Sequence, residues 1–159
     1  MPILDFAAFA AALPTRGALI GIDPGAKRIG AAVSDPDRII ASPIEQIART
    51  RFAEDAQRLF ALMDGRAVVG IVVGLPLNMD GSAGPAAQSA RAFARNLAER
   101  RDLPLLLWDE RWSTAAVTRT LIEAESSRQR RGEVVDKLAA AYLLQGALDR
   151  LKEDALRTS

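Results

Sequence analysis

The chain has 159 residues, of which 49% are hydrophobic and 26% charged, and this composition indicates one globular domain. It contains no cysteine and no histidine. Their absence excludes disulfide bonds, cysteine nucleophiles, thiolate or imidazole metal sites and every catalytic couple that depends on histidine. The net charge of +1 points to no particular partner. An enzyme built on this chain must therefore use carboxylates, hydroxyls, Lys, Arg or a metal ion held by oxygen ligands.

The N-terminal segment predicts neither export nor a membrane partner. An apolar stretch begins at Phe6, but Asp5 precedes it and no basic residue does, unlike a signal peptide. No run of apolar residues approaches the roughly 20 that span a membrane. We therefore expect a cytoplasmic protein. Residues 1–16 are expected to form an appendage with a short helix capped by Asp5, followed by a single domain over residues 17–159.

The first part of this domain is predicted to be a meander of three strands. Apolar runs at residues 18–23 and 28–34, joined by a short turn, predict a β-hairpin. A third strand is expected at residues 38–41, after the turn-forming residues 35–37. So short a connection favours antiparallel pairing with the second strand.

The rest of the chain alternates between helices and strands. Apolar residues at helical spacing predict a helix over residues 51–63, and the nearly all-apolar run 67–73 predicts a strand at the centre of the sheet. The further elements expected are a loop at 74–85, a helix at 86–101, a strand at 104–108, a helix capped by Ser113 or Thr114, a polar basic segment at 126–132 and a last helix at 134–151. The sequence thus predicts an α/β domain with a mixed five-stranded sheet and flanking helices.

Three carboxylates stand at informative places in this arrangement. Asp23 ends the first strand, Glu110 follows the strand at 104–108, and Asp136 lies near the start of the last helix. Functional groups in open α/β sheets gather at the carboxyl ends of strands, which favours the first two. Clustered carboxylates imply raised pKa values or a bound cation. Since oxygen ligands suit Mg²⁺ or Mn²⁺, the set predicts two-metal hydrolysis of phosphodiesters.

Each of these acids also has a structural interpretation. Asp23 can shape the turn that follows it. Asp109 and Glu110 can form a pair at the strand end, with one of them bound to Arg111. Asp136 can be an ordinary acid at a helix start, favoured by the helix dipole, and its position by itself favours that interpretation.

Basic residues supply candidate contacts to a nucleic-acid backbone. Lys27 and Arg28 lie in the first hairpin, and Arg128, Arg130 and Arg131 lie in the basic segment before the last helix. A solvated charged loop explains the second group equally well.

The loop at 74–85 is longer than the usual strand-to-helix connection of about 2 to 6 residues. Its glycine amides and the start of the following helix can receive phosphate oxygens, although a Gly-rich loop is weak support by itself.

Four motifs follow one another along the domain: GIDPGAKRIG at 21–30, VGLPLNMDGS at 73–82, DERWST at 109–114 and DKLAA at 136–140. On these motifs the chain resembles the YqgF family, also called RuvX, whose members are nucleases of the ribonuclease H-like superfamily related to Holliday junction resolvases. The resemblance covers about residues 17–150. It implies a ribonuclease H-like three-layer fold, a metal-dependent phosphodiesterase activity and a role in maturing the 5′ end of pre-16S ribosomal RNA.

The resemblance also implies roles for individual residues. It places the catalytic and metal-binding carboxylates on Asp23, Glu110 and Asp136, with Mg²⁺ or Mn²⁺ as the ion. Junction-resolving relatives carry a pair of acids on the last helix, and in this chain the second acid is either absent or Glu133. The basic segment before that helix resembles the substrate-facing region of the family. The implied partner is pre-16S rRNA, free or within pre-ribosomal particles, bound by a monomer or a homodimer.

Three other functions stay open. A four-way DNA junction is the alternative substrate, because ribonuclease H-like sites cut RNA, DNA and junctions with the same metal chemistry. A non-catalytic module that binds RNA or the ribosome would keep the same fold. The Gly-x-Asp-x-Gly pattern around Asp23 also looks like the phosphate loop of actin and sugar-kinase ATPases, although those proteins are far longer than 159 residues.

Overall fold

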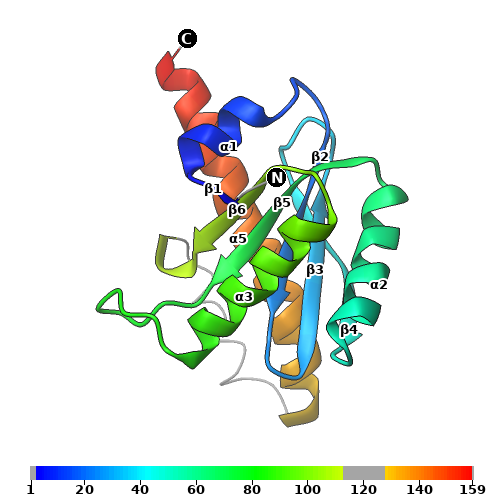
Figure 1. Ribbon diagram of the computed structural model, residues 1–159. Coiled ribbons are helices and arrows are strands. Elements are labelled where there is room, and N and C mark those ends of the chain that lie inside the picture. Colours follow the sequence, from blue (N-terminus) through cyan, green and yellow to red (C-terminus); the bar gives the residue numbers. More distant parts are fainter. Residues whose placement is uncertain (1–2, 113–127, 159) are drawn as a thin grey trace.

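A mixed six-stranded sheet forms the centre of the computed structural model (Figure 1). The structure describes residues 3–112 and 128–158, and it describes side chains for residues 3–111 and 138–157. The strand order is β1-β6-β5-β2-β3-β4. The strands are β1 (Ile3–Leu4), β2 (Ala18–Pro24), β3 (Arg28–Ser34), β4 (Ala41–Ala48), β5 (Val68–Leu75) and β6 (Leu105–Asp109). The helices are α1 (Phe6–Ala12), α2 (Phe52–Asp64), α3 (Pro85–Arg100) and α5 (Arg128–Thr158), with a 3-10 turn, η1 (Glu110–Trp112).

Strand direction changes once across this sheet. The meander β2-β3-β4 is antiparallel, whereas β1, β6, β5 and β2 run parallel to one another. The central strand β5 is the nearly continuous apolar run VVGIVVGL, as a strand covered on both faces should be. As a result, the carboxyl ends of β2, β5 and β6 meet at one edge of the sheet.

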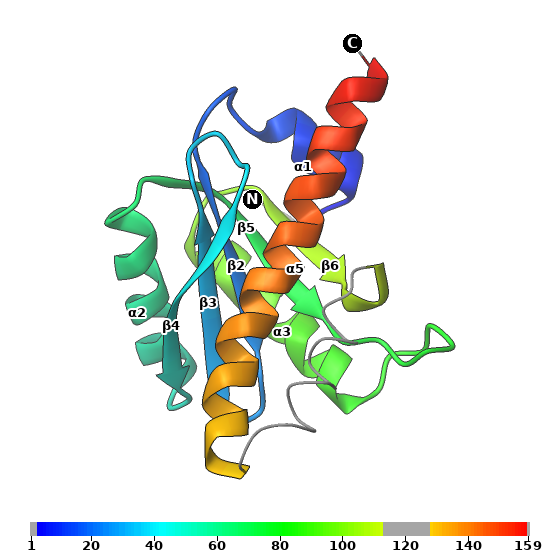
Figure 2. The same cartoon turned by 180° about the vertical axis from the view of Figure 1, so that it is seen from behind.

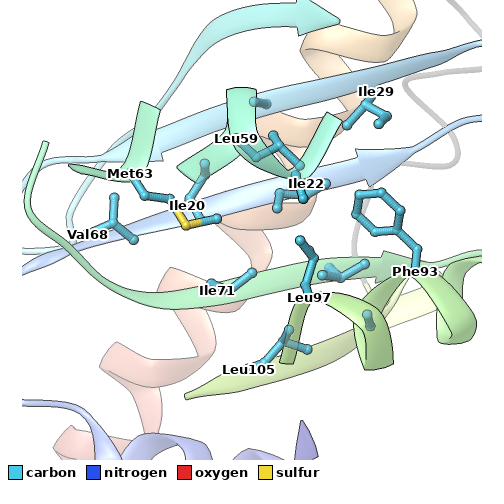
Figure 3. Packing of buried hydrophobic residues seen from close by; sticks show 14 of the residues in the cluster. Ile20, Ile22, Ile29, Leu59, Met63, Val68, Ile71, Phe93, Leu97 and Leu105 are labelled. Atoms are coloured by element: carbon cyan, nitrogen blue, oxygen red, sulfur yellow. The ribbon is translucent and has the colours of Figure 1, made fainter. Parts of the chain in front are cut away.

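Helices cover both faces of the sheet, so the protein has three layers (Figures 1 and 2). Helices α2 and α3 lie on one face, and side chains such as Ile20, Ile71 and Leu97 fill the core beneath them (Figure 3). Helix α5 crosses the other face, where Leu19 and Leu144 belong to a second core cluster. Successive residues of a strand point to opposite faces, which is how β2 supplies both cores. The predicted α/β fold with helices on both faces is confirmed.

The prediction of five strands is wrong, because the N-terminal segment adds a sixth. Ile3 and Leu4 pair in parallel with Leu105 and Leu106 of β6. Asp5 caps α1 as expected, since its carboxylate accepts a hydrogen bond of 2.8 Å from the amide of Ala8. Phe9 of α1 is fully buried in the second core cluster, so this segment packs as part of the molecule.

The third strand of the meander begins later than predicted. Residues 38–41 were expected to form it, but β4 spans Ala41–Ala48. The Asp35 carboxylate accepts hydrogen bonds from the amides of residues 37, 39 and 40, and this turn occupies the residues before the strand. Pro43 lies at a register shift in β4, and the edge position of that strand tolerates its missing amide hydrogen.

Helix α5 is longer than the helix predicted at 134–151. Residues 128–132, expected to be a polar segment outside the helix, are helical. Arginine and glutamine are good helix formers, and a single glycine costs only about 1 kcal/mol in a helix. The helix expected after Ser113 or Thr114 lies outside the described residues. Within the described ranges, no helix has the length and hydrophobicity of a membrane span.

Candidate active site

Two of the predicted acids lie at the same edge of the sheet. Asp23 lies near the end of β2, and Glu110 directly follows β6. Strand β5 lies between them, with Val73 in register with Ile22 of β2 and Gly74 in register with Trp108 of β6. Both carboxylate residues are buried, with relative exposures of 7% and 6%.

Both acids also belong to the face that α5 covers. A Cβ atom added to Gly21 would lie 2.7 Å from Leu144 Cβ and 2.9 Å from the Ala140 carbonyl of α5. Because residues two apart share a face of a strand, Asp23 has the same orientation as Gly21. Glu110 lies on that face as well, since its Oε1 atom is 2.8 Å from the position that a Cβ on Gly74 would occupy.

Gly21 and Gly74 make room for this arrangement. Without a side chain at Gly21, the backbone of α5 can approach the centre of the sheet closely. At Gly74 the space that a Cβ would take lies against Glu110 Oε1 and Leu143 Cδ2, both at 2.8 Å. Gly74 was expected in a loop whose glycine amides can receive phosphate oxygens, but it lies in β5; no individual role was predicted for Gly21. The available signal was a small residue next to the carboxyl end of an otherwise bulky apolar strand.

The neighbouring acid Asp109 has a different task. Its carboxylate accepts hydrogen bonds from Arg111 Nη2 at 2.6 Å, from Arg111 Nε at 3.0 Å and from the Arg111 amide at 3.0 Å. Burial would raise the pKa of Asp109, but the hydrogen bonds and charge of Arg111 outweigh it and hold that pKa below its usual value. The prediction that one acid of the pair binds Arg111 is confirmed, and that acid is Asp109.

The third predicted acid is only partly described. Asp136 lies in helix α5, four residues and about one turn before Ala140, but its side chain lies outside the described residues. The same holds for Glu133 and for the side chains of Arg128, Arg130 and Arg131. The structure therefore places Asp23 and Glu110 at the same edge and on the same face of the sheet, and these five positions stay predictions.

The first hairpin carries the other basic candidates to the same edge of the sheet. The turn between β2 and β3 directly follows Asp23, with Lys27 exposed and Arg28 half-buried at the start of β3. Arg49, which the sequence analysis did not single out, braces this turn by donating a hydrogen bond of 2.7 Å from Nη1 to the Gly25 carbonyl. Its guanidinium also lies 5.4 Å from the ring centroid of Phe93.

The donor set at this edge fits a hard divalent cation. Asp23 and Glu110 offer only oxygen atoms, and the chain has no histidine or cysteine to bring a softer ion. Among the described side chains no three potential ligands form a group. A complete site would therefore need at least one oxygen donor beyond these two.

Comparison with known proteins identifies the family. The family model described as "RuvX: Holliday junction resolvase" matches residues 17–150. The chain belongs to the RuvX family. The resemblance carried by the four sequence motifs is thereby confirmed.

Two bacterial proteins match nearly the whole chain. A protein of Caulobacter vibrioides (strain NA1000 / CB15N) is 58% identical over 154 residues, which are 96% of this chain and 99% of the relative. A protein of Bradyrhizobium sp. (strain BTAi1 / ATCC BAA-1182) is 61% identical over 150 residues, which are 94% of this chain and 93% of the relative. Both carry the name "Putative pre-16S rRNA nuclease".

Solved structures of RuvC have a fold similar to that of this RuvX-family chain. The chain is similar to Thermus thermophilus RuvC in complex with a Holliday junction substrate, with a TM-score of 0.54 and 15% identity over 85% of this chain and 96% of RuvC. A second RuvC structure gives a TM-score of 0.51 at 14% identity. At this identity the similarity concerns the fold, and it confirms the predicted ribonuclease H-like class.

Proposed function

We propose that this member of the RuvX family is a nuclease that hydrolyses phosphodiester bonds of pre-16S rRNA during its maturation. The observation that carries the proposal is the pair of buried carboxylates, Asp23 and Glu110, on one face of the sheet at the carboxyl ends of β2 and β6. The names of relatives 58% and 61% identical to the chain support the substrate. As a nuclease of ribosomal RNA precursors, the protein would act in the cytoplasm.

The acids of this edge are proposed to bind two divalent cations, Mg²⁺ or Mn²⁺. Asp23 and Glu110 would ligate from the sheet, and Asp136 would contribute from α5, whose chain reaches Gly21 one turn later at Ala140. Such ions, when bound, supply the attacking hydroxide and stabilise the leaving oxygen. Asp23 and Glu110 are buried at the edge of the sheet, which limits how far these two carboxylates move when substrate arrives. Glu133 is the proposed additional ligand.

The basic residues are proposed to bind the phosphate backbone on either side of the cut. Lys27 and Arg28 follow Asp23 in the first hairpin, and Arg128, Arg130 and Arg131 lie in the first turns of α5. Contacts of this kind release counterions, so binding should weaken as salt increases. We expect Arg130→Ala with Arg131→Ala to reduce the salt dependence as well as the affinity, whether the chain acts as a monomer or a homodimer.

Cleavage of two substrates side by side tests the proposal. A pre-16S rRNA fragment and a four-way DNA junction would be incubated with wild type and Asp23→Asn in Mn²⁺, Mg²⁺ or EDTA. Asp37→Asn is the matched control, because Asp37 is an exposed acid in the turn between β3 and β4 that pairs with Arg16. We expect metal-dependent cutting of the RNA by wild type and Asp37→Asn, and loss of cutting in Asp23→Asn.

The DNA junction is the second candidate substrate, because the matching family model is described as a Holliday junction resolvase. Cutting of the junction and not of the RNA would replace pre-16S rRNA with branched DNA. If the folded protein bound RNA but cut neither substrate, a non-catalytic binding module would be the better description.

A further inference from the structure

The loop between β5 and α3 carries an apolar side chain far into solvent. Met79 is 87% exposed, more than the other exposed large hydrophobic residues of the described chain, Ile39, Ile40 and Leu156, whose values run from 57% to 69%. In Figure 1 the loop projects from the end of β5 away from the body of the sheet. Burial of this apolar side chain would lower its free energy, so its exposed position needs an explanation.

The exposure of Met79 is imposed by an ordered turn. The amide of Asn78 donates to the Ser82 carbonyl at 2.9 Å, and the amide of Gly81 donates to the Asn78 carbonyl at 2.8 Å. Asp80 Oδ1 accepts from the amide and the hydroxyl of Ser82, at 2.9 and 2.6 Å. Gly81 has a φ of +90°, a backbone conformation that glycine adopts readily. These bonds close the turn around Met79 and leave its side chain outside.

The two ends of this loop are anchored in the core. Leu77 and Ala83 pack against the small apolar cluster of Leu75, Ala87 and Ala90 beneath α3. The tip therefore extends from two fixed points, and Met79 has a defined place relative to the sheet.

Arg111 ties the tip of the loop to the candidate active site. Its Nη1 donates a hydrogen bond of 3.3 Å to the Met79 carbonyl, while Nε and Nη2 hold the Asp109 carboxylate. Arg111 directly follows Glu110 in η1. The Arg111 side chain thus connects the backbone of Met79 to Asp109, the residue before the candidate metal ligand Glu110.

We propose that residues 76–84 form a substrate arm, in which Met79 packs against a base of the bound nucleic acid and Arg111 positions the arm. The inference rests on the proposed nuclease function. A base that is not stacked in a helix presents an apolar face, and single-stranded or distorted segments expose such faces next to a cut site. Methionine suits this contact because its side chain is flexible and polarisable, and apolar wedges of this type unstack bases in other nucleic-acid complexes.

Binding of a fluorescent RNA tests the contact of Met79. The probe is a pre-16S rRNA stem-loop with 2-aminopurine beside the cut position, bound in the absence of divalent metal. We expect Met79→Ala to weaken binding about 10-fold, as loss of one base-packing contact does, and to reduce the unstacking signal of 2-aminopurine. Met79→Leu should retain most of both. Ile39→Ala is the matched control, since it removes a large exposed apolar side chain in the turn before β4. If Met79→Ala and Ile39→Ala had the same affinity for the RNA probe and gave the same 2-aminopurine fluorescence, the proposal that Met79 contacts a base would be refuted.

A double-mutant cycle tests the positioning role of Arg111. Arg111→Gln should weaken binding of the same probe, and Met79→Ala should add little in the Arg111→Gln background, because the side chain would no longer be held in place. Arg111→Lys should not rescue the effect, since it cannot bind Asp109 in two places while reaching Met79. A merely structural role for Arg111 would instead give multiplicative effects of the two changes, and that outcome would remove Arg111 from the proposal.

The same experiments separate failure of the arm from failure of the proposed function. Wild type that cuts the RNA, with Met79→Ala cutting and binding equally well, would leave the nuclease function standing and refute the arm. Wild type that binds the probe through Met79 but cuts nothing would support the arm and contradict the nuclease function. Wild type that neither binds nor cuts the RNA would contradict both.

Discussion

The two faces of the sheet are built from the same strands for different purposes. On the face covered by α2 and α3, apolar side chains such as Ile20, Ile22 and Phe93 form a buried core (Figure 3). On the face covered by α5, glycines stand at positions 21 and 74 of these strands, and acids follow at the strand ends. One face buries apolar area for stability, and the other gives up some of that area to bring a helix and carboxylates together.

The contrast recurs between two consecutive residues. Asp109 and Glu110 are both buried acids at the end of β6. Asp109 is bound by Arg111, whereas Glu110 extends over Gly74 toward the face of α5. Adjacent residues leave a strand on opposite sides, so the two acids belong to different faces of the sheet. Asp109 binds Arg111, and Glu110 lies on the face that carries Asp23.

The largest effect on RNA cleavage should come from removing the negative charge of these two acids one at a time. We expect Glu110→Gln to reduce metal-dependent RNA cleavage at least about 100-fold with little change in the unfolding transition, because a metal ligand contributes several kcal/mol to the transition state. Asp109→Asn should do the opposite, lowering thermal stability while most cleavage persists. Cleavage rates and circular dichroism melting of both variants provide the measurement. A similar loss of cleavage in both would mean that the two acids do not differ as we describe.

Truncation of one leucine on each face should separate stability from activity. Leu97 belongs to α3 and Leu144 to α5, and both are fully buried. We expect either change to Ala to lower the free energy of unfolding by about 2–5 kcal/mol in urea titrations. Cleavage per folded molecule should fall only for Leu144→Ala, because Leu144 packs α5 against the face that carries the acids, whereas Leu97 packs on the opposite face. Equal cleavage by the two variants would contradict the link between α5 packing and the site.

A methyl group at Gly74 should disturb the site more than the fold. A Cβ there would lie 2.8 Å from Glu110 Oε1 and from Leu143 Cδ2, both ends of flexible side chains that can shift. We expect Gly74→Ala to reduce cleavage about 10-fold, through the displaced carboxylate, with a small loss of stability. Gly65→Ala is the control, since its nearest neighbours would be at 3.5 and 3.8 Å and its φ of −66° suits alanine. Unchanged cleavage by Gly74→Ala would place the Glu110 carboxylate outside the reaction.

The smallest effect should be a dependence of stability on pH that comes from the Asp109–Arg111 pair. The pKa of Asp109 is lower in the folded protein than its usual value of 3.8, so the folded state favours the ionised form. This contribution to stability is therefore complete above pH 3.8 and is lost as the pH falls through the lowered pKa. We expect the stability difference between wild type and Arg111→Gln to be constant near neutral pH and to shrink in strong acid. A difference that grows toward low pH would contradict this sign.

Local patterns predicted most of the elements well. The helix expected at 51–63 is α2, Phe52–Asp64, and the strand expected at 67–73 is β5, Val68–Leu75. Both depend on spacing of apolar residues within one segment. The failures involve partners distant in the sequence. Strand β1 exists because Ile3 and Leu4 meet the exposed edge of β6, about a hundred residues later, and two residues carry no periodic pattern.

The sequence by itself determined the kind of chemistry available to this protein. Without histidine or cysteine, and with acids at the ends of apolar runs, the candidates were carboxylates that suit Mg²⁺ or Mn²⁺, whatever the fold. Only the tertiary structure decided that Asp23 and Glu110 share a face of the sheet and that Arg111 binds Asp109. It also decided that α5 approaches closely at Gly21 and the Glu110 carboxylate at Gly74. Composition and periodicity are local properties, whereas strand order, register and close approach arise only when distant segments pack together.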